Sequence, residues 1–214
     1  MLDSLIRAWR RLRHGAPIVV VSGLPRSGTS MAMKMLAAGG VPIVTDGERT
    51  ADEDNPKGYF EDERIKDLAA MDDKTWLRAA RGQAIKVISH LLKELPADNN
   101  YRVLFIRRDM SEILASQTKM LGRRGESSAT DDGRMADLFE ADLWRARYLL
   151  KRGRHFEWLE LHYGDFHADP AGQATKIRDF LGLDLDTTGM ASVVDPSLWR
   201  NRQEQTAAPP DGTT

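Results

Sequence analysis

The chain contains no cysteine in its 214 residues. This absence excludes disulfide bonds, thiolate nucleophiles and zinc or iron–sulfur sites with cysteine ligands. Long apolar runs are also missing, because the longest, Ile18-Val19-Val20-Val21, is far shorter than the roughly 20 residues that span a bilayer. The first residues lack the apolar segment and the small-residue cleavage site of a signal peptide. We therefore expect a cytoplasmic protein without a membrane-spanning helix.

The chain also lacks an excess of charge of either sign. It carries 31 Lys and Arg against 32 Asp and Glu, for a formal net charge of -1. Proteins that bind nucleic acid usually carry a basic excess, so we expect no nucleic-acid partner, and any site for a polyanion must be local. A hydrophobic share of 41% and a charged share of 29% are typical of a globular domain.

We expect one main domain over residues 17–202, because neither an internal repeat nor a linker interrupts that span. Residues 203–214 are polar and contain prolines, which predicts a flexible tail. Residues 1–16 have the spacing of an amphipathic helix, with an apolar stripe through Leu5 and Trp9 among several arginines. That pattern predicts either a first helix docked on the domain or a helix in peripheral contact with an anionic membrane.

Short runs of branched residues alternate with amphipathic segments along the domain. The strands are expected at Ile18–Ser22, Ala84–Ile88, Arg102–Ile106 and Glu157–His162. The helices are expected at Thr29–Ala38, Asp62–Met71, Leu91–Leu95, Asp109–Leu121, Arg134–Arg152 and Pro170–Leu181. This alternation predicts an α/β fold, a three-layer sandwich with a mainly parallel sheet, similar to the P-loop NTPases. Two longer loops, 45–58 and 122–133, are expected over the functional site.

The most informative motif lies between the first strand and the first helix of the domain. Gly23 and Gly28 bracket four residues, which is the spacing of a phosphate-binding loop. Glycines let successive backbone N–H groups point inward, and the helix N-terminus adds about half a positive charge, so an anion is expected there. The alternative is an ordinary strand-to-helix turn that is capped by Ser27 or Thr29.

This motif differs from that of the nucleoside triphosphatases in two ways. The lysine that follows the second glycine in those enzymes is replaced by Thr29, and the cation stands earlier, at Arg26. A neighbouring strand that would end in an acidic Mg²⁺ ligand ends here in Arg107-Arg108. Two guanidinium groups at a strand end suit a phosphate and not a metal ion, so we expect no metal site.

These residues resemble the sulfotransferases that use 3′-phosphoadenosine 5′-phosphosulfate (PAPS). The 5′-phosphosulfate loop of that family reads Pro-(Arg/Lys)-Ser-Gly-Thr-(Thr/Ser), and the segment from Pro25 to Ser30 matches it throughout. The family's 3′-phosphate motif has an arginine at a strand end and a serine eight residues later, which is the spacing of Arg108 and Ser116. The resemblance implies a site for PAPS and for its product, adenosine 3′,5′-bisphosphate (PAP). The implied binding residues are Arg26, Ser27, Gly28, Thr29, Ser30, Arg108 and Ser116.

Three further features accompany these motifs. Asp109 and Glu112 have the spacing of a capping pair, which places the start of a helix just after Arg108. Arg107 either faces solvent or a carboxylate, or exchanges roles with Arg108. The block from Leu161 to Leu183 is similar to the family's C-terminal strand, Asp-Pro turn and helix, and we interpret it as scaffold without chemistry of its own.

The resemblance also implies an in-line transfer of a sulfuryl group. Arg26 and the loop N–H groups would then stabilise the charge that develops on the leaving phosphate. In cytosolic members a histidine in a Lys-Thr-His-Leu-Pro segment accepts the acceptor's proton. His90 is in register with that histidine, while the lysine is displaced to Lys86. The other interpretation of His90 is a solvated histidine at a helix start.

A second candidate for the catalytic base is acidic. In the protein-tyrosine branch of the family a glutamate beyond the loop is the base, which points to Glu48, with Asp46 and Glu61 nearby. The other interpretation of Glu48 is one solvated acid in an acidic loop. The acceptor is expected to be a hydroxyl or an amine of a small molecule, glycan or peptide. The alternatives to a sulfotransferase are a small-molecule P-loop kinase, which needs Mg²⁺, and a non-catalytic nucleotide-binding protein of the same fold.

Overall fold

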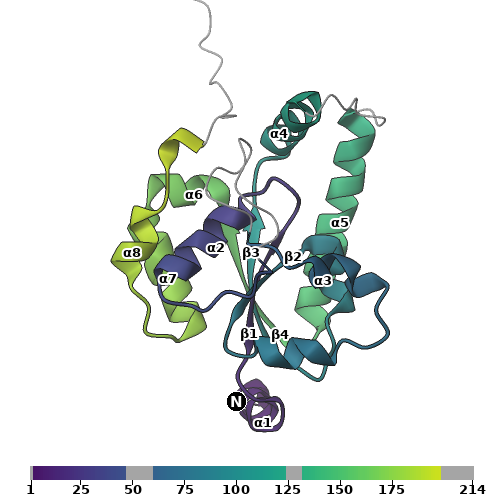
Figure 1. The fold of residues 1–214 in the computed structure, drawn as a ribbon, viewed down its shortest axis with the longest axis vertical. Coiled ribbons are helices and arrows are strands. Elements are labelled where there is room, and N and C mark those ends of the chain that lie inside the picture. Colours follow the sequence, from purple (N-terminus) through teal and green to yellow (C-terminus); the bar gives the residue numbers. More distant parts are fainter. Residues whose placement is uncertain (1, 47–59, 124–131, 199–214) are drawn as a thin grey trace, which may run out of the picture.

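A computed structural model describes residues 2–46, 60–123 and 132–198. Within them the chain forms a parallel sheet of four strands in the order β2-β1-β3-β4 (Figure 1). The strands are β1 (Ile18–Gly23), β2 (Ala84–Ile88), β3 (Tyr101–Arg107) and β4 (Phe156–His162). The parallel sheet confirms the predicted α/β class, and each strand ends within one residue of its predicted bounds.

Helices cover both faces of the sheet, which confirms the three-layer prediction (Figure 1). One face packs against α2 (Thr29–Ala38), α6 (Tyr163–Ala168), α7 (Pro170–Leu181) and α8 (Thr187–Ser192). The other face packs against α3 (Glu63–Lys66), α4 (Met110–Arg123), α5 (Asp132–Arg152) and the 3-10 helices η1 (Asp67–Ala69), η2 (Thr75–Ala80) and η3 (Ser89–Glu94). A last 3-10 helix, η4 (Pro196–Leu198), follows α8.

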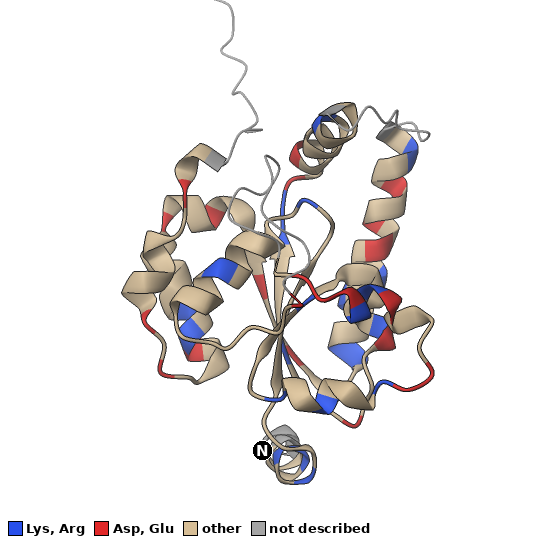
Figure 2. Ribbon diagram, in the orientation of Figure 1, with Lys and Arg blue, Asp and Glu red and all other residues tan. Residues whose placement is uncertain are grey.

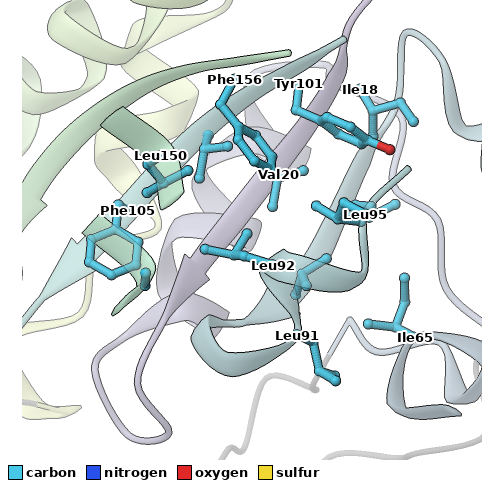
Figure 3. Packing of buried hydrophobic residues seen from close by; sticks show 14 of the residues in the cluster. Ile18, Val20, Ile65, Leu91, Leu92, Leu95, Tyr101, Phe105, Leu150 and Phe156 are labelled. Carbon is cyan, nitrogen blue, oxygen red and sulfur yellow. The ribbon is translucent and has the colours of Figure 1, made fainter. Parts of the chain in front are cut away.

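The pleat of β1 divides the hydrophobic core between these two layers. Ile18 and Val20 point into one cluster, whereas Val19 and Val21 point into the other. Figure 3 shows the first cluster, whose members include Leu92, Tyr101, Phe105, Leu150 and Phe156. Burying each large apolar side chain contributes about 1.5–3 kcal/mol. The core therefore stabilises the central strand β1, and with it the start of the loop that follows β1.

The parallel arrangement brings three strand ends to one edge of the sheet. Gly23, at the end of β1, pairs with Ile88 of β2 and with Ile106 of β3. The loop after β1, the start of η3 and the Arg107-Arg108 pair therefore meet at the carboxyl edge. Ligands of open α/β sheets bind at this edge.

Two predicted helices differ from the structure. The span 62–71 forms α3, which ends at Lys66, and then the 3-10 helix η1, which ends at Ala69. Residues 91–94 of the predicted span 91–95 belong to η3, a short 3-10 helix and not an α-helix, and Leu95 is already extended. Pro96 follows it, and the residue before a proline is driven out of the helical region. Neither η2 nor α8 was predicted from the sequence.

The helix predicted in the first residues is α1 (Leu2–His14), which lies at the amino ends of the strands (Figure 1). Among the described residues, no helix is both long and apolar enough to cross a bilayer. The predicted tail, 203–214, and most of the two loops expected over the site, 45–58 and 122–133, fall outside the described residues.

Candidate active site

Two glycines shape the loop between β1 and α2. Gly23 has a φ of 154° and Gly28 a φ of 102°, and both values favour glycine. A Cβ on Gly23 would lie 2.5 Å from the backbone oxygen of Ile106. A Cβ on Gly28 would lie 2.3 Å from Cδ2 of Tyr163. The predicted strand, glycine-bounded turn and helix are present, and neither glycine has room for a side chain.

The N-terminus of α2 is left open toward the loop. Gly28 is its N-cap residue and provides no side-chain cap in the described structure, so the alternative of a cap by Ser27 or Thr29 is wrong. Ser27 is only 1% exposed, and its Oγ has no hydrogen-bond partner among the described residues. A buried hydroxyl without a partner costs free energy, and the first N–H groups of a helix favour an anion. Both features indicate an anion site at the start of α2.

Arg26 connects this loop to α4. Its φ of 66° is left-handed, a conformation that costs a residue with a Cβ about 1–3 kcal/mol and that clusters at functional sites. The Arg26 Nε donates to Ser116 Oγ at 3.0 Å. The Arg26 backbone oxygen accepts from Arg108 Nη1 at 3.2 Å. The loop arginine therefore contacts both residues of the second motif.

Arg108 is held by two more contacts. Its Nε donates to Glu112 Oε2 at 2.8 Å, and the two side chains are only 8% and 9% exposed. The guanidinium also lies 4.3 Å over the ring of Tyr163. Glu112 thus binds Arg108 through its carboxylate, and its backbone N–H donates to the Asp109 carboxylate, as expected of the predicted capping pair at the start of α4. Asp109 begins α4 by accepting the backbone N–H of Ser111 at 2.9 Å, and its hydrogen bonds from Ser111 lower the pKa of Asp109.

Arg107 turns toward β4, where it faces a carboxylate, one of the alternatives that the sequence left open. Its Nη1 lies 3.8 Å from Glu160 Oε2, which Arg147 also approaches. Both strand-end arginines nevertheless border one small hollow at the carboxyl edge. That hollow is lined by Leu24, Ser27, Ile106, Arg107, Arg108, Ile113 and Leu143. Figure 2 marks the basic residues of the loop after β1 and of the end of β3 at this edge.

Tyr163 is a site residue that the sequence did not reveal. It is the first residue of α6, is 5% exposed, and packs its ring against Gly28 and under Arg108. Burial raises the pKa of its phenol. Tyr163 thus lies in the block 161–183 that the sequence analysis interprets as scaffold, and its ring supports both the loop and Arg108. No local signal identifies Tyr163, because its contacts are with segments far away in the sequence.

Lys86 reaches the start of α2 from the neighbouring strand β2. Its Nζ donates to Ser30 Oγ at 3.2 Å and to Glu61 Oε1 at 2.8 Å. The Lys86 and Glu61 side chains are 17% and 16% exposed, so this ion pair is largely shielded from solvent. Lys66 Nζ approaches the other carboxylate oxygen of Glu61 at 3.5 Å. The structure thus brings Lys86 to the loop together with Glu61, which the sequence placed only in the vicinity of Glu48.

The structure describes His90, the first of the two predicted bases, but not Glu48, the second. His90 is exposed on η3, directly after the end of β2 at the carboxyl edge. Its neighbours Ser89 and Leu91 are buried, and Ser89 Oγ donates to Asp142, which fixes the backbone on both sides of His90. Glu48 lies outside the described residues. Among the described residues, no group of three or more histidine and acidic side chains is placed to hold a metal ion.

The sequence matches a known protein family. The model of the sulfotransferase family matches residues 73–187, which is just over half of the chain. The chain belongs to the sulfotransferase family. It is therefore an enzyme of sulfuryl transfer. The matched span of this sulfotransferase includes Lys86, Arg108 and Ser116, whereas the loop from Gly23 to Ser30 precedes it.

Two solved structures are similar to the sulfotransferase described here. One is a sulfotransferase from Alicyclobacillus acidocaldarius, with 15% identity, coverage of 86% of this chain and 88% of that chain, and a TM-score of 0.48. The other is the sulfotransferase domain from the curacin biosynthetic pathway, with 14% identity, coverage of 88% and 78%, and a TM-score of 0.46. No curated protein matches the sequence.

Proposed function

We propose that this sulfotransferase takes a sulfuryl group from PAPS and transfers it to a hydroxyl or an amine of a small-molecule, glycan or peptide acceptor. The observation that carries the proposal is the hydrogen bond from Arg26 Nε to Ser116 Oγ, at 3.0 Å. It joins the loop of the first motif to the helix of the second, so the two anion-binding motifs adjoin. Adjacent anion sites suit a nucleotide with phosphates at both its 3′ and 5′ positions.

The residues of the loop suit the chemistry of such a ligand. Bound PAPS supplies a sulfuryl group whose departure leaves negative charge on the 5′-phosphate. We assign Arg26 and the N–H groups at the start of α2 to that charge, because preorganised donors stabilise developing charge without reorganising. Glu61 holds Lys86 toward Ser30, which adds a second cation beside the first turn of α2. The buried Ser27 hydroxyl, which lacks a partner among the described residues, is a further donor.

We assign the 3′-phosphate to Arg108 and Ser116. Arg108 is buried against Glu112, yet a guanidinium has five N–H donors, and its bonds to Glu112 and to the Arg26 backbone engage two of its nitrogens. Ser116 receives a bond from Arg26 and retains a hydroxyl proton to donate. Both residues therefore keep donors for a phosphate beside the loop.

The two alternative functions lose their support once the family is known. A small-molecule kinase and a non-catalytic nucleotide-binding protein share the fold class, but neither is a sulfotransferase. The end of β3 also differs from a kinase site, because Arg107 there pairs with Glu160. A strand end of this kind offers no acidic ligand for Mg²⁺.

PAP is expected to stabilise the protein in buffer that contains EDTA, because both proposed anion sites are built from protein donors. At a concentration about a hundred times its dissociation constant, a ligand that binds only the folded state adds about 2.7 kcal/mol of stability. Thermal unfolding with PAP, compared with ATP and Mg²⁺, measures this effect. A shift that appears only with ATP and Mg²⁺ would contradict the assignment of PAPS as donor.

Replacing Arg108 by alanine is expected to weaken PAP binding about 10- to 100-fold, because a charge-assisted hydrogen bond contributes about 1.5–3 kcal/mol. The affinity for adenosine 5′-monophosphate, which has no 3′-phosphate, should change much less. Calorimetric titration of both nucleotides with the variant and the wild type gives the difference. Arg108 also pairs with Glu112, so the substitution could disturb the fold in general. Such a disturbance would weaken the affinity for both nucleotides equally and would cancel in their ratio.

Glu112→Gln is the matched control for that variant. It removes the charge that holds Arg108 while leaving the guanidinium in place, so the preference for PAP over adenosine 5′-monophosphate should persist. If Arg108→Ala weakens the two nucleotides equally, Arg108 supports the fold and does not bind the 3′-phosphate.

A further inference from the structure

The helix α1 is attached to the domain by its polar side. Arg10 Nε donates to Asn100 Oδ1 at 3.0 Å, and Asn100 Nδ2 returns a bond to the backbone oxygen of Arg10 at 3.1 Å. Arg10 Nη2 donates to the backbone oxygens of Ala97 and Asn99 at 2.7 and 2.9 Å. These bonds join the helix to the turn before β3 and determine which of its faces points outward.

The apolar stripe of α1 faces away from the domain. Leu5, Trp9 and Leu12 are 64%, 54% and 88% exposed. Their separations of four and three residues place them on one face of the helix. A helix that docked on the domain through its apolar face would bury these three side chains. The helix is therefore docked on the domain, one of the two predicted arrangements, but Arg10 makes the attachment and leaves Leu5, Trp9 and Leu12 exposed in the described structure.

Positive charge borders this apolar face. Arg11 and Arg13 are exposed, and the Arg13 guanidinium lies 5.1 Å over the ring of Trp9. The segment Leu2–His14 contains four arginines and one aspartate, whereas the whole chain has a net charge of -1. Figure 2 shows basic residues on this helix at the foot of the sheet. The surface that would cover α1 must therefore accept apolar side chains and carry negative charge.

We propose that α1 docks the protein on the surface of a membrane that contains anionic lipid, with Leu5, Trp9 and Leu12 in the interface. A helix with leucine and tryptophan on one face and arginines beside them has the composition of helices that lie in the plane of a bilayer surface. A second copy of the chain suits the face poorly, because pairing two such helices would bring their arginines together. Like charges in contact oppose such an association.

Docking through α1 turns the active site away from the lipid. The helix lies at the amino ends of the strands, and the phosphate loop lies at their carboxyl ends (Figure 1). The six residues of β1 separate the two by about 20 Å, at about 3.3 Å per residue. Acceptors therefore approach the docked enzyme from the aqueous side, and vesicle binding should leave PAP affinity unchanged.

The test is co-sedimentation of the full chain with phosphatidylcholine vesicles, with and without phosphatidylserine. The wild type should sediment with the anionic vesicles. Trp9→Ala/Leu12→Ala should bind them at least about tenfold more weakly, because apolar area is lost from the interface. Arg11→Gln/Arg13→Gln should bind the anionic vesicles about 25-fold more weakly. Each basic residue near an anionic surface raises the affinity about fivefold, or about 1 kcal/mol.

The matched control is Leu138→Ala/Trp144→Ala on α5, which removes a leucine and a tryptophan that are 55% and 67% exposed. It should bind as the wild type does. Equal binding to neutral vesicles, an equal loss in this control, or no binding at all would overturn the proposal. So would a wild-type dimer that Trp9→Ala/Leu12→Ala converts to a monomer in sedimentation velocity, because a second copy would then cover α1. A thermal shift with PAP in each variant, measured separately, tests the proposed function without involving the membrane.

Discussion

Replacing Gly28 by alanine is expected to destabilise the fold by about 2–6 kcal/mol and to reduce PAP binding below detection. The added Cβ would lie 2.3 Å from Cδ2 of Tyr163, and the φ of 102° is unfavourable for alanine. Left-handed strain costs about 1–3 kcal/mol, and overpacking costs a similar amount. The ring of Tyr163 also lies beneath Arg108, so relief of the clash would move both anion-binding motifs. Chemical denaturation and calorimetric titration with PAP measure the two losses.

Gly40→Ala is the matched control for this substitution. Gly40 has a similarly unfavourable φ of 91°, but a Cβ there would meet no atom within 4 Å. Its cost should therefore be the backbone strain alone, with PAP binding retained. Gly28→Ala combined with Tyr163→Ala tests the same point, because removing the ring should restore part of the lost stability. Equal losses for Gly28→Ala and Gly40→Ala would mean that the contact with Tyr163 does not shape the loop.

Local signals were sufficient for most of the fold. The helices Thr29–Ala38 and Pro170–Leu181 have their predicted bounds. Gly39 ends the first, and Asp169 begins the second by accepting the backbone N–H of Gly172 at 2.9 Å. The spacing of branched residues located the strands, and the central strands β1 and β3 are buried almost throughout by the helices on their faces. What the sequence left open was the strand order, which depends on packing between distant segments.

The contacts of the site were harder to predict because they join distant segments or compete with local ones. The spacing of Asp109 and Glu112 located the start of α4, but it did not show that the Glu112 carboxylate also binds the buried guanidinium of Arg108. Glu61 reaches Lys86 across the fold: Ile43 bridges to Ala84 of β2, and the nearby residues Thr45 and Asp46 bind the backbone oxygen of Glu61. The stripe on α1 predicted an amphipathic helix, yet Arg10 determined which face is attached. Periodicity identifies a face without identifying its partner.

The same limit applies to the catalytic base, for which the sequence indicates His90 or Glu48, with Asp46 and Glu61 near the second. Glu61 is near the loop, but its carboxylate pairs with Lys86 and Lys66, so we propose that it positions Lys86 and is not the base. His90 has an exposed ring on a fixed backbone at the carboxyl edge, directly after the strand that carries Lys86. A base needs access to the acceptor as well as nearness to the donor. His90 is exposed to solvent, and Glu48 lies outside the described residues.

His90→Ala is therefore expected to lower turnover about 10²- to 10⁴-fold, the usual effect of losing a general base, while PAP affinity stays near that of the wild type. Glu48→Gln should have a small effect on turnover. Glu61→Gln should affect PAP binding together with turnover, because it releases the ammonium of Lys86 beside α2. Single-turnover rates with radiolabelled PAPS and an acceptor found by screening, together with calorimetric PAP affinities, separate the three variants.

A large loss of turnover for Glu48→Gln with a small one for His90→Ala would assign the base to the acidic loop. If neither variant slows transfer, the acceptor releases its proton without a base, and catalysis rests on Arg26, Lys86 and the loop N–H groups.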